Sequence, residues 1–169
     1  MTDFSIRPAR PGDEATLFEL IRGLARFEAL EHQLTGNPQA LARDLFGERP
    51  AAEALLVELD HVAVGYALYF TSYSSFMARP GLYLEDLFVV EQHRGMGIGK
   101  ALIGRVAQVA VRRGYARFEW SVLDWNARAI RFYQGLGAEV LPDWRICRVT
   151  NDALRRLGQA ERADAPGKP

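Results

Sequence analysis

The chain has 169 residues, of which 49% are hydrophobic and 25% charged, so it is long enough to form one sizeable hydrophobic core. Its 21 basic residues balance its 21 acidic residues, and a net charge of zero argues against a general nucleic-acid-binding protein. The single cysteine, Cys147, excludes an intrachain disulfide framework, and without a signal-peptide core or a long apolar run the chain is expected in the cytoplasm, away from membranes.

The first half of the chain predicts three strands and two helices. Apolar residues at helical spacing mark the first helix. Asn37 followed by Pro38 marks the start of the second, because asparagine caps a helix and proline fits its first turn. The expected elements are a strand at 4–9, helices at 11–30 and 38–47, and strands at 52–59 and 62–72.

The second half predicts further strands and helices after a loop that contains Pro80-Gly81. The expected elements are a loop at 74–81, a strand at 82–90, a helix at 97–113, a strand at 116–123, a helix at 126–135, and short strands near 138–141 and 144–149. Residues 1–157 are expected to form one domain. Residues 158–169, rich in alanine, glycine, proline and charge, are expected to be a disordered tail.

The segment 82–100, LYLEDLFVVEQHRGMGIGK, is the most informative part of the sequence. An apolar run gives way to an arginine and three glycines, and a helical pattern follows. Glycines let a backbone approach a ligand closely. A glycine-rich loop between a strand and a helix directs free N–H groups and the positive helix end to one point, which favours phosphate.

Three interpretations of this loop remain at this stage. The dinucleotide fingerprint is G-x-G-x-x-G, whereas here the spacing is G-x-G-x-G, although Glu119 on a later strand could supply the acid of that fingerprint. The nucleoside-triphosphate loop is disfavoured, because its spacing and its hydroxyl residue are both wrong here. A glycine-rich turn without a ligand is the third interpretation.

The segments RGMGIG and YLEDLFVV resemble the acetyl-CoA site of the GNAT N-acetyltransferases, whose signature is [QR]-x-x-G-x-[GA]. The resemblance extends over residues 4–157. Seven segments occur in the order expected for the spermidine/spermine (diamine) acetyltransferase branch: IRPARPGDEATLFELIRGLARFE, DLFGERP, GYALYF, YLEDLFVV, RGMGIG, DWN and RFYQGLGA. The resemblance implies an α/β (α+β) fold, with a single domain built on a mixed, mostly antiparallel sheet flanked by helices.

The resemblance implies acetyl-CoA as co-substrate and no metal. It assigns the pantetheine arm to the backbone of one strand, and the phosphates to the glycine loop and the start of a later helix. The cofactor residues implied are Leu87, Phe88, Val89, Arg94, Gly95, Met96, Gly97, Ile98, Gly99, Lys100, Asn126, Ala127, Arg128, Ala129 and Tyr133. Without a ligand, Asn126 would cap its helix.

Two carboxylates interrupt the apolar strand at 82–90. Strand alternation predicts that Glu85 and Asp86 point to opposite faces, and a buried ionised carboxylate is costly unless it is paired. Asp86 is equally well explained as a structural ion pair. The resemblance implies that Glu85 is the base that acts on the amine through water, and that Tyr133 stabilises the departing thiolate. From the residues alone, Tyr133 is more simply explained as a helix tyrosine packed on the core.

The resemblance also implies a set of acceptor-binding residues: Phe27, Glu28, Glu85, Glu119, Trp120, Ser121, Asp124 and Trp144. This chain departs from the branch at Phe27, where tyrosine is usual, and in the loop SYSSFMARPG, which lacks an acid. Fewer anions weaken the attraction for a polycation. A singly charged, lysine-like amine therefore competes with spermidine as the expected acceptor.

The function implied is direct transfer of acetyl from acetyl-CoA to a primary amine of a small molecule by an acyltransferase that works as a homodimer. The alternative is a non-catalytic acyl-CoA-binding or interaction module with the same fold. The presence of both Glu85 and Tyr133 favours the enzyme.

Overall fold

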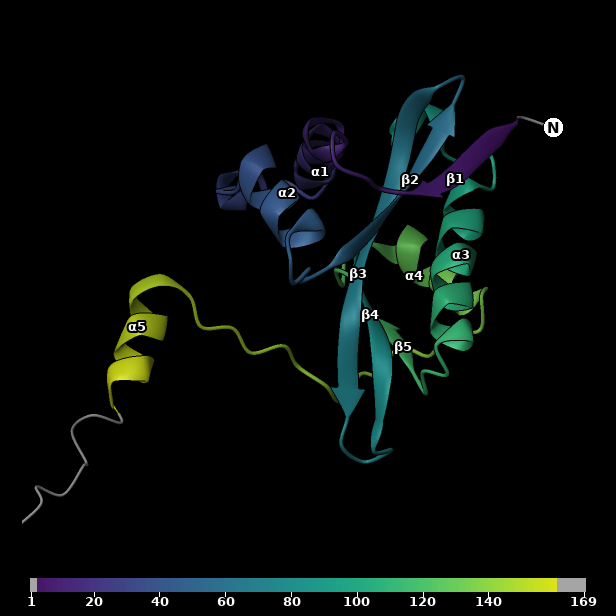
Figure 1. The fold of residues 1–169 in the computed structure, drawn as a ribbon. Coiled ribbons are helices and arrows are strands. Elements are labelled where there is room, and N and C mark those ends of the chain that lie inside the picture. The colour runs from purple at the N-terminus through teal and green to yellow at the C-terminus, as the bar shows by residue number, and fades with distance from the viewer. Residues whose placement is uncertain (1–2, 161–169) are drawn as a thin grey trace, which may run out of the picture. The chain divides into compact units, whose positions relative to one another are not determined.

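The computed structural model describes residues 3–160 and divides the chain into two compact units, Met1–Ser121 and Val122–Pro169. The first unit holds a five-stranded sheet with strand order β1-β2-β3-β4-β5 (Figure 1). All neighbouring strands are antiparallel except β4 and β5, which run parallel. The strands are β1 (Phe4–Pro8), β2 (Glu53–Leu59), β3 (Val62–Ser74), β4 (Arg79–Val89) and β5 (Phe118–Trp120). The predicted mixed, mostly antiparallel sheet is confirmed.

Helices cover both faces of this sheet. Helices α1 (Glu14–Phe27) and α2 (Pro38–Phe46) lie on one face, and α3 (Ile98–Arg112) lies on the other (Figure 1). Short 3-10 turns, η1 (Glu31–Gln33) and η2 (Glu91–His93), follow α1 and β4. The Asn37 side chain accepts a 2.8 Å hydrogen bond from the backbone N–H of Ala40, so the predicted cap of α2 is confirmed.

Each face has its own hydrophobic core. Leu17 and Leu20 of α1 pack with Leu56, Tyr66 and Phe88 of the sheet. On the other face, α3 buries a continuous stripe: Ile98, Leu102, Ile103, Val106, Val109 and Ala110. Burying one such large side chain contributes roughly 1.5–3 kcal/mol. The two cores therefore fix β4, which lies between α1 and the start of α3, as a rigid platform.

Two predicted boundaries in the first unit are wrong. Residues 79–81 belong to β4 rather than to a loop, because the carbonyl of Pro80 accepts a hydrogen bond from the N–H of Ala116 and the strand continues in register with β3. Proline lacks only the N–H, so it is tolerated where its carbonyl alone is needed. The strand predicted at 116–123 is also shorter, since only Leu82, Tyr83 and Leu84 of β4 pair with it.

The second unit contains two helices, α4 (Ala127–Gln134) and α5 (Asn151–Ala160). The strands predicted at 138–141 and 144–149 are wrong, because no partner strand pairs with these residues in the structure described for 3–160, and an unpaired strand is not stable. Helix α5 was not predicted. It includes residues 158–160 of the expected tail, and the remainder of that tail lies outside the described residues.

The helices of the described residues include none that is both long and apolar enough to span a bilayer.

Candidate active site

The glycine loop ends in a helix start that lacks a side-chain cap. Gly95 and Gly97 have φ angles of 84° and 82°, a left-handed conformation that glycine adopts without strain. Gly97 is the N-cap residue of α3, and no side chain bonds to the first-turn N–H groups there. A Cβ on either glycine would meet no other atom within 4 Å. The loop therefore presents backbone N–H donors to open space, as a phosphate cradle requires.

The edge of β4 beside this loop has no strand neighbour in residues 3–160. Pairing with β5 stops at Leu84, whereas pairing with β3 continues to Val89 on the other edge. The N–H of Val90 donates to the carbonyl of Val64, so Gly65 and Val89 form a non-hydrogen-bonded pair. By alternation, the backbone groups of Leu87 and Val89 face the open edge, while those of Phe88 face β3.

A bulge in β4 changes the expected placement of the two carboxylates. Asp86 pairs with Leu68 and Leu84 pairs with Tyr69, so Glu85 has no partner residue on β3. Side chains do not alternate strictly between the two faces across a bulge, because the extra residue changes the direction in which the neighbouring side chains point. The prediction of opposite faces, made from a regular strand, therefore does not apply here. Glu85 is exposed and Asp86 is partly buried.

Asp86 lies at the centre of an acidic cluster formed with Glu28 and Glu85. The buried hydroxyl of Tyr66 donates a 2.9 Å hydrogen bond to its carboxylate. The pKa of Asp86 is raised to about 6, mainly by burial and also by the charges of Glu85 and Glu28, while the hydrogen bond from Tyr66 lowers it. Burial also raises the pKa of Glu28.

No salt bridge of the described residues includes Asp86. The alternative that Asp86 is a structural ion pair is therefore not supported. A partly buried carboxylate with two acidic neighbours is instead well suited to receive a cation. Sequence reasoning left Asp86 and Tyr66 out of the site. The only signal was an acid and a tyrosine within two otherwise apolar strands.

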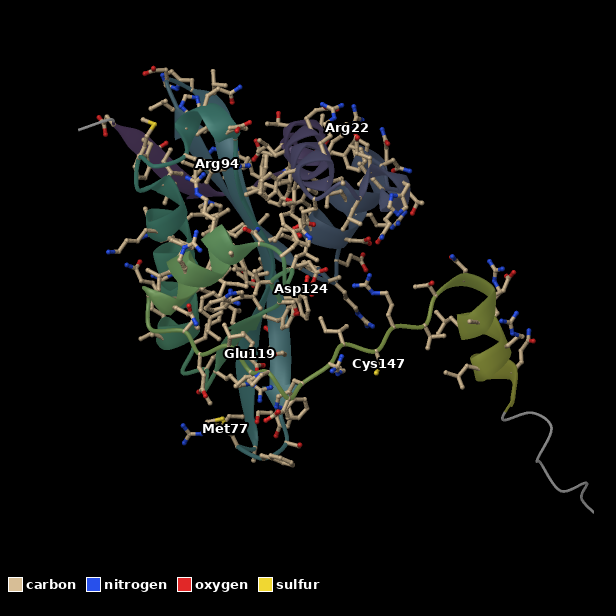
Figure 2. The ribbon with its side chains drawn as sticks, turned by 180° about the vertical axis from the view of Figure 1, so that it is seen from behind. Arg22, Met77, Arg94, Glu119, Asp124 and Cys147 are labelled. Atoms are coloured by element: carbon tan, nitrogen blue, oxygen red, sulfur yellow. The ribbon has the colours of Figure 1, made fainter. Side chains whose placement is uncertain are left out.

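Arg94 is held by side-chain and backbone contacts on the first unit. Its Nε donates a 2.9 Å hydrogen bond to the carbonyl of Val89. Its guanidinium lies 4.4 Å from the ring centre of Phe27 and 5.7 Å from that of Phe88. Figure 2 labels Arg94 in the loop before α3. The side chain thus connects the glycine loop with the end of α1.

The acceptor residues expected on and after β5 are distributed over both faces. Glu119 forms a 2.7 Å ion pair with Arg117, and the Ser121 hydroxyl lies 2.7 Å from the hydroxyl of Tyr83. Trp120 packs against Phe118 with the rings tilted by 57° and 5.0 Å between ring centres. Side chains alternate along a strand, so Trp120 faces away from Glu119. The first unit therefore brings together Glu28, Glu85 and Asp86, but separates Trp120 from Glu119.

The remaining predicted residues belong to the second unit. Asn126 caps α4 by accepting a 3.1 Å hydrogen bond from the N–H of Ala129, which confirms its predicted capping role. Tyr133 lies on the last turn of α4, partly buried, with its ring centre 5.2 Å from that of Phe132. Trp144 is 77% exposed on the segment without regular structure.

Comparison with known proteins identifies the family. The profile of the Acetyltransferase (GNAT) family matches residues 19–138. The chain belongs to the GNAT acetyltransferase family. Its GNAT relatives include the thialysine N-epsilon-acetyltransferase of Mus musculus, 39% identical over 93% of this chain and 98% of the relative. They also include the L-ornithine N5-acetyltransferase of Arabidopsis thaliana, 34% identical over 90% of this chain and 86% of the relative.

Solved structures share the fold of this chain. An integron cassette protein from the mobile metagenome of V. cholerae superposes with a TM-score of 0.78 at 23% identity, covering 94% of this chain and 99% of that protein. An aminoglycoside acetyltransferase from an uncultured soil metagenomic sample gives a TM-score of 0.74 at 18% identity, covering 87% of this chain and 97% of that protein.

GNAT enzymes use acetyl-CoA as co-substrate, and two observations on this chain fit that molecule. The uncapped start of α3 above two left-handed glycines offers donors for phosphate oxygens. The open edge of β4 offers backbone groups of Leu87 and Val89 to an extended amide-bearing arm, in the manner of an added strand.

Proposed function

We propose that this protein transfers the acetyl group of acetyl-CoA directly to a primary amine of a small cationic molecule, within a ternary complex. The observation that carries the proposal is the acidic cluster of Glu28, Glu85 and Asp86. Glu28 is the C-cap residue of α1, and Glu85 and Asp86 begin the open edge of β4. A cationic acceptor bound there has its amine beside the strand that receives the pantetheine arm. Membership of the GNAT family supports acetyl-CoA as the donor of the acetyl group.

The cofactor is held mainly by backbone. Leu87 and Val89 bond to the pantetheine arm, with Phe88 packing beneath, while the N–H groups of the loop and the first turn of α3 bind the pyrophosphate. The family resemblance adds the start of α4 to the proposed contacts. The proposed contacts are Gly95, Met96, Gly97, Ile98, Gly99 and Lys100 in the loop, and Asn126, Ala127, Arg128 and Ala129 at α4.

The protein must present a neutral amine to the bound thioester. A lysine-like amine has a pKa of about 10.4, so at pH 7 the neutral form costs roughly 4.6 kcal/mol. Glu85 is proposed to accept the amine proton through a water molecule, since its carboxylate is exposed at the bulge. The amine nitrogen then forms the new bond to the acetyl carbon, and the carbon–sulfur bond breaks. The nitrogen loses its second proton to solvent, and the departing thiolate takes up one proton from solvent, which gives the amide and free CoA thiol.

The departing sulfur needs stabilisation. Tyr133 is proposed to donate a hydrogen bond to the developing thiolate. A tyrosine has a pKa of about 10 and a thiol about 8.5, so complete proton transfer from Tyr133 to the thiolate is uphill by roughly 2 kcal/mol. A hydrogen bond to the thiolate does not carry this cost. Family resemblance at RFYQGLGA supports this role.

The acceptor class follows from the charges. Glu28 and Asp86 attract the second cationic group of a diamine or of a lysine-like or ornithine-like amino acid. The two relatives above are named as acetyltransferases of thialysine and of ornithine. A spermidine/spermine N(1)-acetyltransferase-like protein of Homo sapiens is a further relative at 30% identity. We propose that Phe27, Glu119 and Ser121 add to the acceptor site, whereas Trp120 faces away from Glu119 and is left out. The roles proposed for Asp124 and Trp144 rest on the family resemblance alone.

Assembly and compartment are part of the same proposal. We propose a homodimer in the cytoplasm, with residues 1–157 acting as one acetyltransferase domain. The family match from 19 to 138 crosses the division at Ser121, which supports a single functional domain.

A screen of amines tests the proposed function. The full chain is incubated with acetyl-CoA and one amine at a time from a panel of polyamines, diamines, lysine analogues and aminoglycosides, and thiol release is measured. The Asp86→Asn variant is compared with the natural protein, because it removes one negative charge of the acidic cluster. Thiol release with a polyamine, a diamine or a lysine analogue supports the proposal if the KM for that amine is higher in the variant. Binding of CoA without release on any amine would instead support a non-catalytic acyl-CoA-binding module.

A further inference from the structure

One contact joins the cofactor loop to the acceptor side of the first unit. The Arg94 guanidinium stacks on Phe27, the last residue of α1, at 4.4 Å from its ring centre. Its Nε is fixed by the carbonyl of Val89, and the next residue in the chain is Gly95. We name this arrangement of Arg94, Phe27 and the Val89 carbonyl the Arg94 bridge. It spans the two places where the proposed substrates bind.

The end of α1 is closed by backbone hydrogen bonds and by a 2.9 Å ion pair between Arg26 and Glu31. The N–H of Glu28 donates to Leu24 and the N–H of Leu30 donates to Ala25, which closes the last turn. Ala29 follows with a left-handed φ of 57°. Phe27 is 43% exposed. Because Phe27 and Glu28 are adjacent in this turn, a backbone shift that moves one residue also moves the other.

Arg94 acts by contact rather than as a counter-ion of the acids. Burial raises the pKa of Glu28, whereas a close guanidinium would lower it. The guanidinium instead lies over the rings of Phe27 and Phe88. A stacked guanidinium positions an aromatic ring through its planar face and its charge.

We propose, building on the proposed function, that the Arg94 bridge is a positioning device. It couples the cofactor loop to the turn at the end of α1 that carries Glu28. Phosphates bound at Gly95–Lys100 restrict the backbone that begins at Arg94. The Arg94 side chain, anchored on the Val89 carbonyl, passes this restriction to Phe27 and to the neighbouring Glu28. Coupling between two sites is reciprocal, so amine binding also favours CoA binding. The expected size is about two- to fivefold in either affinity, which matches an exposed cation–π contact.

Hydrogen exchange of the full chain tests the bridge, with CoA itself as the probe. CoA is expected to slow exchange of the amides at 98–102 and also of those at 28–30. Phe27→Leu keeps an apolar side chain but removes the ring face, so the CoA-dependent slowing at 28–30 should fall by about two- to fivefold while that at 98–102 stays. Phe27→Tyr keeps the ring face and should restore it. Arg94→Gln should repeat the loss at 28–30.

Arg22 provides the matched control. It lies over Phe18 on the same helix, at 5.7 Å from the ring centre, and pairs with Glu19 of that helix at 3.1 Å (Figure 2). Arg22→Gln should leave the CoA-dependent slowing at 28–30 unchanged. Equal slowing at 28–30 in Phe27→Leu and the natural protein would overturn the proposal, as would slowing at 98–102 without any at 28–30 in the natural protein. No slowing at 98–102 would instead refute the cofactor site itself.

Discussion

The hydroxyl of Tyr66 donates a 2.9 Å hydrogen bond to Asp86, and both groups lie on the α1 face of the sheet, at the end of α1 that carries Glu28. Tyr66 is fully buried, and its own pKa is raised well above the usual value, first by burial and then by Asp86. The phenol therefore stays a donor, and it holds a carboxylate that has no cationic partner among the described residues. The carboxylate of Asp86 is therefore available to a cationic ligand, and its burial without a cation lowers the stability of the folded protein.

Replacing Asp86 with asparagine should stabilise the protein at neutral pH. The folded-state pKa of about 6 exceeds the ordinary value of 3.8, so the folded protein binds the proton more tightly than the unfolded chain does. The free energy of unfolding therefore falls as the pH rises from about 4 to 6, and the cost is fully present above pH 6. Asp86→Asn should gain about 1–3 kcal/mol at pH 8 and nothing near pH 3.5. Urea unfolding at both pH values measures this, and an equal change at both would contradict it.

Gly97→Val should abolish acetyl-CoA binding without unfolding the protein. The left-handed φ of 82° disfavours a side chain by about 1–2 kcal/mol, yet nothing within 4 Å clashes inside the protein. The new side chain instead occupies the space proposed for phosphate. Gly104→Ala, in the middle of α3 and equally free of clashes, is the control and should bind normally. Calorimetric titration with CoA decides, and normal affinity in a folded Gly97→Val protein would exclude the loop as the phosphate site.

Tyr133→Phe should lower kcat by roughly 10- to 1000-fold, the effect of losing a donor to developing charge. The loss should be the same across the pH range in which the amine titrates, since Tyr133 acts on the thiolate. Steady-state thiol release from pH 7 to 9 measures it. Near-normal turnover would leave Tyr133 with a packing role on α4.

The proposed dimer predicts a mass of two chains in solution. Light scattering at micromolar protein and above measures it. A monomer whose mass does not change with concentration would refute this assembly.

Local chemistry made much of the fold predictable. Asn37 with Pro38, Asn126 before α4 and the apolar stripe of α3 each act over a few residues, and the structure has each of them. The sheet class was available from the order of strands and helices together with the family resemblance.

Features that depend on distant partners were not predictable. The bulge that frees Glu85 arises from the register of β4 against β3, which the sequence of one strand does not contain. The alternating residues 138–149 resemble strands, yet alternation indicates faces rather than a partner to pair with. Arg94 appeared suited to phosphate, whereas its contact with Phe27 joins residues far apart in sequence.

The central claim is that Glu85 lowers the cost of presenting a neutral amine to acetyl-CoA, and a pH–rate profile of Glu85→Gln tests it most directly. With the amine that gives the fastest thiol release, kcat/KM is measured from pH 6.5 to 9.5 for the natural protein and the variant. The loss in Glu85→Gln should be greatest near pH 7 and should shrink at high pH, where more amine is already neutral. CoA binding should be unchanged. Parallel profiles, with the same loss at every pH, would contradict the role of Glu85 as the base.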